Sequence, residues 1–420
     1  MKAILIILIV LPLSLTFAQT QTFPTQTPQT LTNTTRVERW RQDLKYLATE
    51  LPKRHKNAFH SITRRQLERT VAKLDKDIPV LQDYEIIVRI RGILGMVGDT
   101  HTNLYGWEDS FHRYPFRFYR FSDGYFVTSA TKSYANILGT RLLRIGNTSI
   151  NKAYDKARAL LPHAESEMYV WNFAPVYLSY AEVLHALRIL PGPKQGRFVF
   201  VDRSGKQFSV EMSPILASEK IELISAAKTT SLYRQKLGEK LWYEYLPDSK
   251  TVYFMSRTSF IPPEEFDAFL SGLLKFIDNN PVERLVIDVR SNNGGNRGIF
   301  RPLIDAIKRN DKINQKGHLF VIIGRGSHSA SMMHGVDLRA ETNALLVGEP
   351  TGSRPNWYSE NCSPNIELPN SHLIAGCSTM YYKLTKENTL LMPDIAVSIS
   401  SSDFIAGRDP VLEKILAYKE

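Results

Sequence analysis

Three serines and two histidines lie close together directly after an apolar run. The stretch from Gly324 to Gly335 reads GRGSHSASMMHG and follows HLFVII, a pattern that predicts a turn between a strand and a helix. A serine there can act as a nucleophile if a base takes its proton. His328 and His334 are poor candidates for that base, because neighbouring side chains diverge and a residue five positions along a helix points away. We therefore expect both to be packing or surface residues and the base to come from elsewhere in the chain.

A second predicted strand end carries paired glycines. The run LVIDVR is followed by Ser291 and then by Asn292-Asn293-Gly294-Gly295. Glycines after a buried strand let backbone amides approach a ligand closely. Such amides can bind the oxyanion that forms when a serine attacks a carbonyl carbon. The two strand ends together therefore favour acyl transfer.

Five segments follow one another in a specific order: LVIDVRSNNGG, GRGSHSASMM, VGEPTG, MPDIAV and AGRDPVLEKIL. In this order the chain resembles the tail-specific, C-terminal processing proteases of peptidase family S41, over roughly residues 240–420. The resemblance implies a ClpP/crotonase-like catalytic domain with Ser329 as the nucleophile and Ser327 and Ser331 as caps or packing residues. It also implies oxyanion donors at the amide of Gly294 or Gly295 and at the amide of Ala330. Met332 departs from the family, which usually carries a glutamate at that position.

The resemblance bears on the base as well. In the processing-protease branch a lysine after the serine takes the proton, but here its position falls near Arg354, and a guanidinium cannot be deprotonated. The branch of tricorn-like proteases and retinoid-binding modules carries the pattern D-x-H, which matches Asp99-Thr100-His101. This similarity implies that His101 is the general base and that Thr100 orients it. A glutamate completes the pattern, and the candidates are Glu387 first, then Glu349 and Glu360.

The elements that must position these residues fall into three regions. Residues 36–105 have helical periodicity and predict a small helical domain. Residues 106–215 are β-rich, resemble a PDZ domain around GTRLLRIGNTSINKAYDKA, and contain a predicted helical insertion at 162–192. Residues 216–420 alternate apolar strands with helices, which predicts a mostly parallel sheet covered on both faces. The expected fold class is therefore a multidomain α/β protein.

The N-terminus is typical of an exported protein. Residues 1–18 combine a lysine, an apolar run and a small-residue cleavage site near Ala18, which predicts a signal peptide. The apolar run is shorter than the roughly 20 residues of a transmembrane helix. Residues 19–35 are rich in Gln, Thr and Pro and predict a flexible linker. We therefore expect a secreted or periplasmic protein, in which Cys362 and Cys377 form a disulfide rather than remain as two buried thiols.

The charge of the chain is uneven. The net charge is +11, and residues 36–76 hold twelve Lys/Arg against five Asp/Glu, which gives +7. For an exported chain without a nucleic-acid motif, we interpret this segment as a solvated helix face that can contact an anionic envelope surface. No cysteine cluster or His-x-x-x-His pair indicates a metal site, and the expected chemistry requires no cofactor.

These patterns favour one function over two alternatives. We expect an exported serine peptidase that cleaves a peptide or unfolded polypeptide through a Ser329 acyl-enzyme, with His101 as the base. The first alternative is a non-catalytic module that binds a peptide or lipid on the same fold. The second is an esterase or amidase that acts on small substrates with the same residues.

Overall fold

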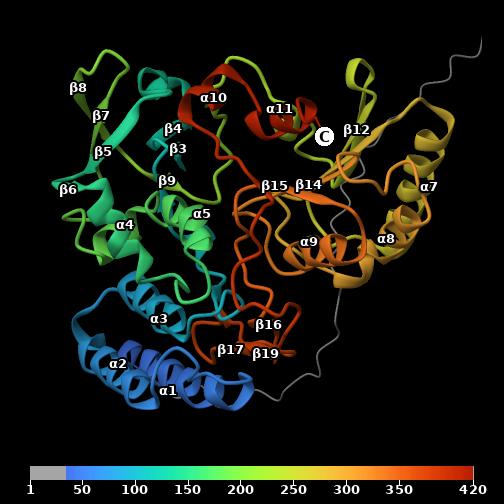
Figure 1. Ribbon diagram of the computed structural model, residues 1–420. Coiled ribbons are helices and arrows are strands. Elements are labelled where there is room, and N and C mark those ends of the chain that lie inside the picture. The colour runs from blue at the N-terminus through green and yellow to red at the C-terminus, as the bar shows by residue number, and fades with distance from the viewer. Residues whose placement is uncertain (1–34, 420) are drawn as a thin grey trace, which may run out of the picture.

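The structure, a computed structural model, describes residues 35–419. The predicted signal peptide at 1–18 and nearly all of the predicted linker at 19–35 lie outside the described residues. Figure 1 shows three adjoining parts: N-terminal helices, a β-rich middle region and a C-terminal α/β region. None of the described helices is both long enough and apolar enough to cross a membrane.

Three helices form the N-terminal region. Thr35 caps the first of them by accepting a hydrogen bond from the backbone N–H of Glu38. Trp40, Leu44 and Leu47 are buried on one face, as their spacing predicts. The helices are α1 (Arg36–Arg54), α2 (Arg64–Asp77) and α3 (Asp83–Val97). α3 ends at Gly98, where a φ of 98° turns the chain into the segment that carries His101.

A seven-stranded antiparallel sheet forms the middle region, with β3 paired to β4 and the main path in the order β10-β4-β5-β7-β8. Its strands are β3 (Phe116–Phe121), β4 (Gly124–Ala130), β5 (Arg141–Ile145), β6 (Thr148–Ser149), β7 (Gly196–Val201), β8 (Gln207–Met212) and β10 (Ile224–Ser225). The accompanying helices are α4 (Ile150–Arg158), α5 (Glu167–Tyr177) and α6 (Ala181–Ala186). α5 and α6 lie within the stretch for which a helical insertion was predicted.

The C-terminal region contains a six-stranded sheet in the order β11-β12-β13-β14-β15-β20. Every pair is parallel except β11 with β12. The strands are β11 (Leu241–Leu246), β12 (Thr251–Ser256), β13 (Arg284–Asp288), β14 (Leu319–Ile323), β15 (Leu345–Gly348) and β20 (Ile395–Ala396). This arrangement confirms the predicted mostly parallel sheet.

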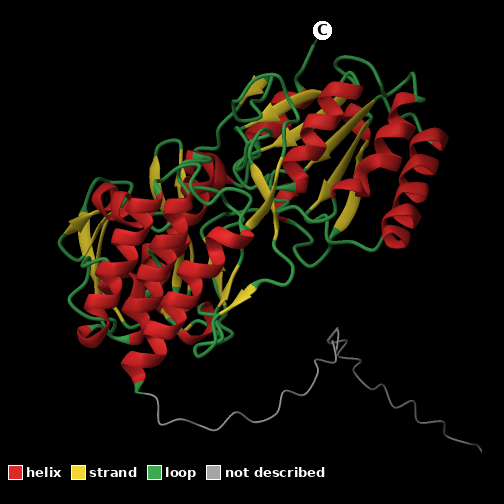
Figure 2. Cartoon of the chain, turned by 90° about the horizontal axis from the view of Figure 1, so that it is seen from below, coloured by secondary structure: helices red, strands yellow, loops and turns green. Residues whose placement is uncertain are grey.

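Helices cover both faces of this sheet, as Figure 2 shows for the lobe that contains it. One face packs against α7, α8 and α9, and the other against α11, so its strands are apolar on both sides. The helices are α7 (Pro263–Asn279), α8 (Arg301–Lys308), α9 (Ala330–Glu341), α10 (Ser401–Ala406) and α11 (Pro410–Leu416).

Between β15 and β20 the chain leaves the sheet and joins the N-terminal region. Figure 1 shows β16, β17 and β19 beside α1 and α3. β18 pairs with β1, and the backbone N–H of Lys56 donates to the carbonyl of Ser378 at 2.7 Å. The strands of this segment and of its partner are β1 (Leu104–Tyr105), β16 (Tyr358–Asn361), β17 (Ile366–Glu367), β18 (Ile374–Ala375) and β19 (Ser378–Tyr381). A separate two-stranded sheet is formed by β2 (His112–Arg113) and β9 (Ile215–Leu216). The segment between β15 and β20 therefore connects the part of the chain that carries His101 with the region that carries Ser329.

The predicted disulfide is not formed in this structure. Cys362 and Cys377 are both free and both buried, although the N–H of Cys362 donates to the carbonyl of Cys377 at 2.8 Å. Burial, followed by the contact with Cys362, raises the pKa of the Cys377 thiol well above its usual range. The two thiols lie next to each other, so the structure describes a reduced and adjacent cysteine pair.

Candidate active site

Ser329 lies between the end of β14 and the start of α9. Its backbone has φ 55° and ψ −127°, a conformation that favours glycine, and its N–H donates to Ser353 Oγ at 3.0 Å. Ser327 Oγ and Ser331 Oγ instead donate to the carbonyl of Val289, at 2.8 and 3.3 Å. Of the three serines in this turn, Ser329 is therefore the one whose hydroxyl is not occupied in holding the turn together.

His101 reaches this hydroxyl from the N-terminal region. Its Nε2 lies 3.1 Å from Ser329 Oγ, across 228 positions of sequence, and 3.4 Å from Ser359 Oγ. Burial lowers the pKa of His101, although the negative charges of Asp99 and Glu360 act in the opposite direction. A neutral imidazole within hydrogen-bond reach of a serine hydroxyl is the geometry of general-base catalysis.

The segment 292–295 after β13, called the glycine loop below, lies against the same serine. A Cβ on Gly294, whose φ is 99°, would come within 2.8 Å of both Ser329 Cβ and the carbonyl oxygen of His328. The amide of Gly294 donates to Asn292 Oδ1 at 2.8 Å. Among the residues that the structure describes, the amides of Gly295 and Ala330 donate to no acceptor. These two N–H groups are therefore the better candidates for binding an oxyanion.

The surroundings of His101 differ from the prediction. Thr100 Oγ1 lies 2.6 Å from His328 Nε2 and forms no hydrogen bond with the ring of His101, which is the contact that an orienting residue would make. His328, expected to be a packing or surface residue, stacks on His101 with ring centroids 5.0 Å apart. The turn of Ser329 is anchored to the glycine loop by the His328 N–H, which donates to the Asn292 carbonyl at 3.2 Å, and this anchor holds His328 against the base. His334, by contrast, is buried and stacks on Phe300, as a packing residue does.

The structure does not bring Glu387 to His101. The Glu387 side chain is exposed, and only its backbone carbonyl is engaged, by the amide of Asn356. Glu349 forms an ion pair with Arg325 instead. His101 Nδ1 is buried without a hydrogen-bond partner among the described residues, so no carboxylate occupies the position that Glu387 was predicted to fill. Of the three candidates, only Glu360 contributes an electrostatic influence on His101.

Sequence reasoning missed a buried carboxyl in the same pocket. Glu165 Oε2 accepts the N–H of Thr100 at 2.8 Å, and Oε1 accepts the N–H of Arg354 at 3.2 Å. One side chain thus joins the segment that precedes the base to the segment that carries Ser353. Burial raises the pKa of Glu165 to about 8, against the opposing effect of the Thr100 N–H. Glu165 stands in a helical insertion of no recognised motif, so nothing in the sequence distinguished it.

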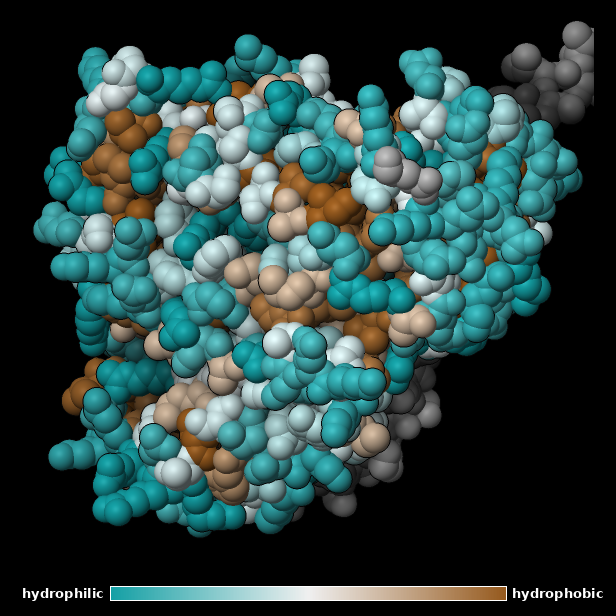
Figure 3. All heavy atoms as spheres, in the orientation of Figure 1, coloured by the Kyte–Doolittle hydropathy of each residue, from teal (hydrophilic) through white to brown (hydrophobic). Residues whose placement is uncertain are grey.

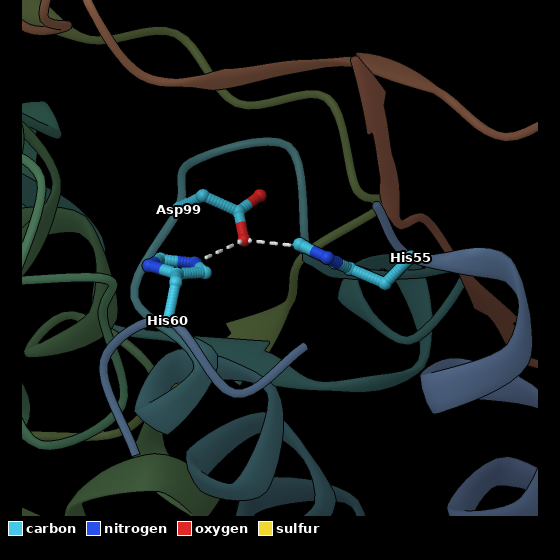
Figure 4. A group of neighbouring side chains, drawn as sticks. All are labelled: His55, His60 and Asp99. Carbon is cyan, nitrogen blue, oxygen red and sulfur yellow. Dashed lines mark hydrogen bonds and ion pairs between the residues drawn. The ribbon is translucent and has the colours of Figure 1, made fainter. Parts of the chain in front are cut away.

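Asp99 anchors the segment of His101 through a buried cluster. Figure 4 shows His55 and His60 directed at its carboxylate, with Nε2–Oδ2 distances of 2.8 and 3.4 Å. Thr102 and Ser378 also hydrogen-bond to this carboxylate. Burial acts to raise the pKa of Asp99, but the hydrogen bonds from the two histidines outweigh it and hold the pKa far below its usual range.

The same three side chains could in principle hold a metal, since their ligand atoms lie within 4.8 Å of one another. The backbone N–H of Asn57, however, donates to His55 Nδ1 at 2.9 Å. The proton of a neutral His55 then lies on Nε2, where it is donated to Asp99 and leaves no lone pair for a metal. The cluster therefore fits a hydrogen-bond network better than a metal centre.

The pocket between His101 and Ser329 is small. Its volume is about 10 Å³, and Met332, Met333, Trp357 and Tyr382 are among the residues that line it. A space of this size holds about one water molecule. Ser329 itself is half-buried, so this small space is only part of its surroundings.

Over nine-tenths of its length, the chain resembles solved structures of CPAF. It matches mature CPAF with a TM-score of 0.57 at 13% identity, over 90% of this chain and 96% of that chain. It matches mature CPAF complexed with lactacystin with a TM-score of 0.56 at 12% identity, over 90% of this chain and 98% of that chain. No family model and no curated protein sequence matches the chain. The likeness shows that the described chain shares the fold of the CPAF structures from its helical region to its parallel sheet.

Proposed function

We propose that this protein is an exported serine peptidase with Ser329 as nucleophile and His101 as general base. One observation carries the proposal: His101 Nε2 lies 3.1 Å from Ser329 Oγ, at the start of α9 and beside the glycine loop after β13. The ordered motifs of the S41 proteases and the fold shared with CPAF support a peptide as the substrate. The predicted signal peptide supports export.

The reaction follows from these positions. His101 takes the proton of Ser329 as Oγ attacks the carbonyl carbon of the scissile bond, and the amides of Gly295 and Ala330 stabilise the oxyanion. His101 then gives the proton to the leaving amine, which departs and leaves an ester on Ser329. A water molecule, activated by the same imidazole, hydrolyses that ester and restores the free hydroxyl.

A second candidate function rests on the unpartnered Nδ1 of His101. No described side chain orients or stabilises a protonated His101 through this atom, and the pocket beside it is small. Both features favour a module that binds its ligand without cleaving it. Catalysis and simple binding make opposite predictions for the reactivity of Ser329.

The test is intact-mass analysis after treatment with a serine-directed fluorophosphonate. The proposal expects one adduct on the protein, none on Ser329→Ala, and a strongly slowed reaction for His101→Gln. Ser331→Ala is the matched control, because Ser331 lies two positions away and its hydroxyl is bound to the Val289 carbonyl. A folded protein that stays unlabelled would favour the binding module. A labelled protein that hydrolyses small esters but not an unfolded polypeptide would favour the esterase.

A further inference from the structure

A large cavity lies between the middle region and the C-terminal sheet. Its volume is about 920 Å³, at the upper end of the roughly 300–1,000 Å³ of ligand pockets. β3 and α5 line one side, and the chain that follows β13 and β14 lines the other. Figure 3 shows hydrophobic residues exposed in the middle of one face of the molecule, surrounded by hydrophilic ones.

Arginine dominates the charge of this cavity. Five arginines line it, and Glu349 is its one acidic residue. Glu349 is paired with Arg325, and Arg290 is paired with two aspartates behind the wall. The other three, Arg113, Arg117 and Arg234, form no ion pair with any described residue. The predicted signal peptide and linker contain no Asp or Glu that could neutralise them.

Two of these arginines have guanidinium nitrogens that are buried without an acceptor. They are Nε of Arg113 and one terminal nitrogen of Arg234, Nη1. Arg234 lies over the ring of Phe404 at 4.1 Å, and burial lowers its pKa because no carboxylate compensates for the lost hydration. Arg234 also donates from Nη2 to Ser225 Oγ at 3.2 Å, but neither it nor Arg113 has a carboxylate partner among the described residues. A half-buried cation without a counter-ion is unfavourable, so an anionic ligand in the cavity would be favoured.

Aromatic side chains also line the cavity, among polar residues such as Thr128, Asn172 and Ser291. Phe116, Tyr119, Phe121, Tyr233 and Phe404 all line the cavity. A free inorganic anion would leave this surface in contact with water. A segment that carries both carboxylates and large apolar side chains satisfies the arginines and covers the aromatic rings at once.

The cavity adjoins the proposed catalytic serine. Asn293 lines it, and the carbonyl of Asn293 lies 3.4 Å from Nδ1 of His328, the residue before Ser329. Gly324 and Gly326, which lead from β14 to Ser329, line it as well. The cavity therefore lies beside the two segments that carry the paired glycines and the proposed nucleophile.

We propose that this cavity selects acidic polypeptide segments, with Arg113, Arg117 and Arg234 binding side-chain carboxylates and the aromatic walls binding apolar side chains between them. The inference names the substrate class of the proposed peptidase and so rests on that function. A substrate that combines Asp or Glu with aromatic or branched aliphatic residues fits both parts of the cavity.

The experiment measures binding separately from catalysis. The full chain with Ser329→Ala is titrated into a fluorescein-labelled peptide of alternating Glu and Phe/Leu, and into the same peptide with every Glu replaced by Gln. Fluorescence anisotropy gives the two dissociation constants. The acidic peptide is expected to bind at least tenfold more tightly, and this preference should weaken as NaCl is raised, because salt screens charge pairs.

Arginine variants test whether the preference for the acidic peptide arises in this cavity. Arg117→Gln and Arg234→Gln are each expected to reduce the preference at least threefold, and Arg117 is exposed, so its replacement leaves the fold intact. Arg203→Gln is the control, because it removes the same charge from an exposed hairpin turn outside the cavity. Equal affinity for the two peptides overturns the inference, and so does a preference that survives both arginine variants. Binding of phosphatidylglycerol vesicles with no peptide binding also overturns it.

The outcomes separate this inference from the proposed function. If the fluorophosphonate fails to label Ser329 but the acidic peptide binds selectively, the peptidase is wrong and the cavity is an acidic-peptide site. If Ser329 is labelled and both peptides bind equally, the peptidase stands and the charge selectivity is wrong.

Discussion

The ring of His328 stacks on the ring of His101, with centroids 5.0 Å apart and an angle of 27° between the planes. The residue before the proposed nucleophile therefore holds the proposed base. Burial and the neighbouring His101 lower the pKa of His328 to about 3, so the second imidazole is neutral near pH 7. It supports His101 without placing a positive charge beside it.

The pH dependence of the reaction should reflect the environment of His101. Burial lowers the pKa of this imidazole below 6.5, its ordinary value, so the neutral, active form persists into mildly acidic solution. The rate of fluorophosphonate labelling, measured from pH 4 to 8, is expected to rise with a midpoint below 6.5. Glu360 raises the pKa of His101, so Glu360→Gln should move the midpoint to lower pH. A midpoint above 6.5 would contradict the role of His101 as a buried base.

Asp99 should matter for both stability and reactivity. Asp99→Asn removes the charge that accepts hydrogen bonds from His55 and His60, at a loss of roughly 1.5–3 kcal/mol in the free energy of unfolding. Because Asp99 anchors the segment of His101, labelling of Ser329 should also slow at least tenfold. Urea unfolding and labelling kinetics at 25 °C measure the two effects. Asp202→Asn, on an exposed turn, is the control and should change neither quantity.

Two bidentate ion pairs of the chain should differ sharply in strength. Arg290 binds Asp409 at 2.8 and 2.9 Å with side-chain exposures of 8% and 5%, whereas Arg301 and Glu341 are exposed to 43% and 31%. Asp409→Asn leaves the buried Arg290 with one carboxylate, Asp288, in place of two, and should lower the free energy of unfolding by roughly 3–5 kcal/mol. Glu341→Gln should change it by about 1 kcal/mol or less. Denaturant titrations that gave equal losses would refute the distinction.

Gly294→Ala should abolish labelling of Ser329. The new Cβ would lie 2.8 Å from Ser329 Cβ, and alanine is disfavoured at a φ of 99°. Either the glycine loop or Ser329 must move, and each adjoins one of the two proposed oxyanion donors, the amides of Gly295 and Ala330. Gly192→Ala is the matched control, because a Cβ there meets no atom within 4 Å. Circular dichroism should show both variants folded, and normal labelling of Gly294→Ala would contradict the proposed site.

The sequence predicted the helical, β-rich and parallel-sheet regions because helical and strand periodicities are local properties. It also singled out Ser329 and His101, which the structure brings within hydrogen-bond distance, and their catalytic roles stay predictions. Glu165 was missed because its importance depends on two backbone N–H groups from distant segments. The roles expected for Thr100 and Glu387 came from a motif order, which does not fix the direction of a side chain.

The backbone of Ser329 has a consequence for how this protein could be improved. A non-glycine residue at φ 55° and ψ −127° is strained by about 1–3 kcal/mol, and glycine adopts the same angles without that strain. Ser329→Gly should therefore yield a more heat-resistant protein that has lost its hydroxyl. Directed evolution for thermal stability, without a screen for activity, would favour replacement of this serine.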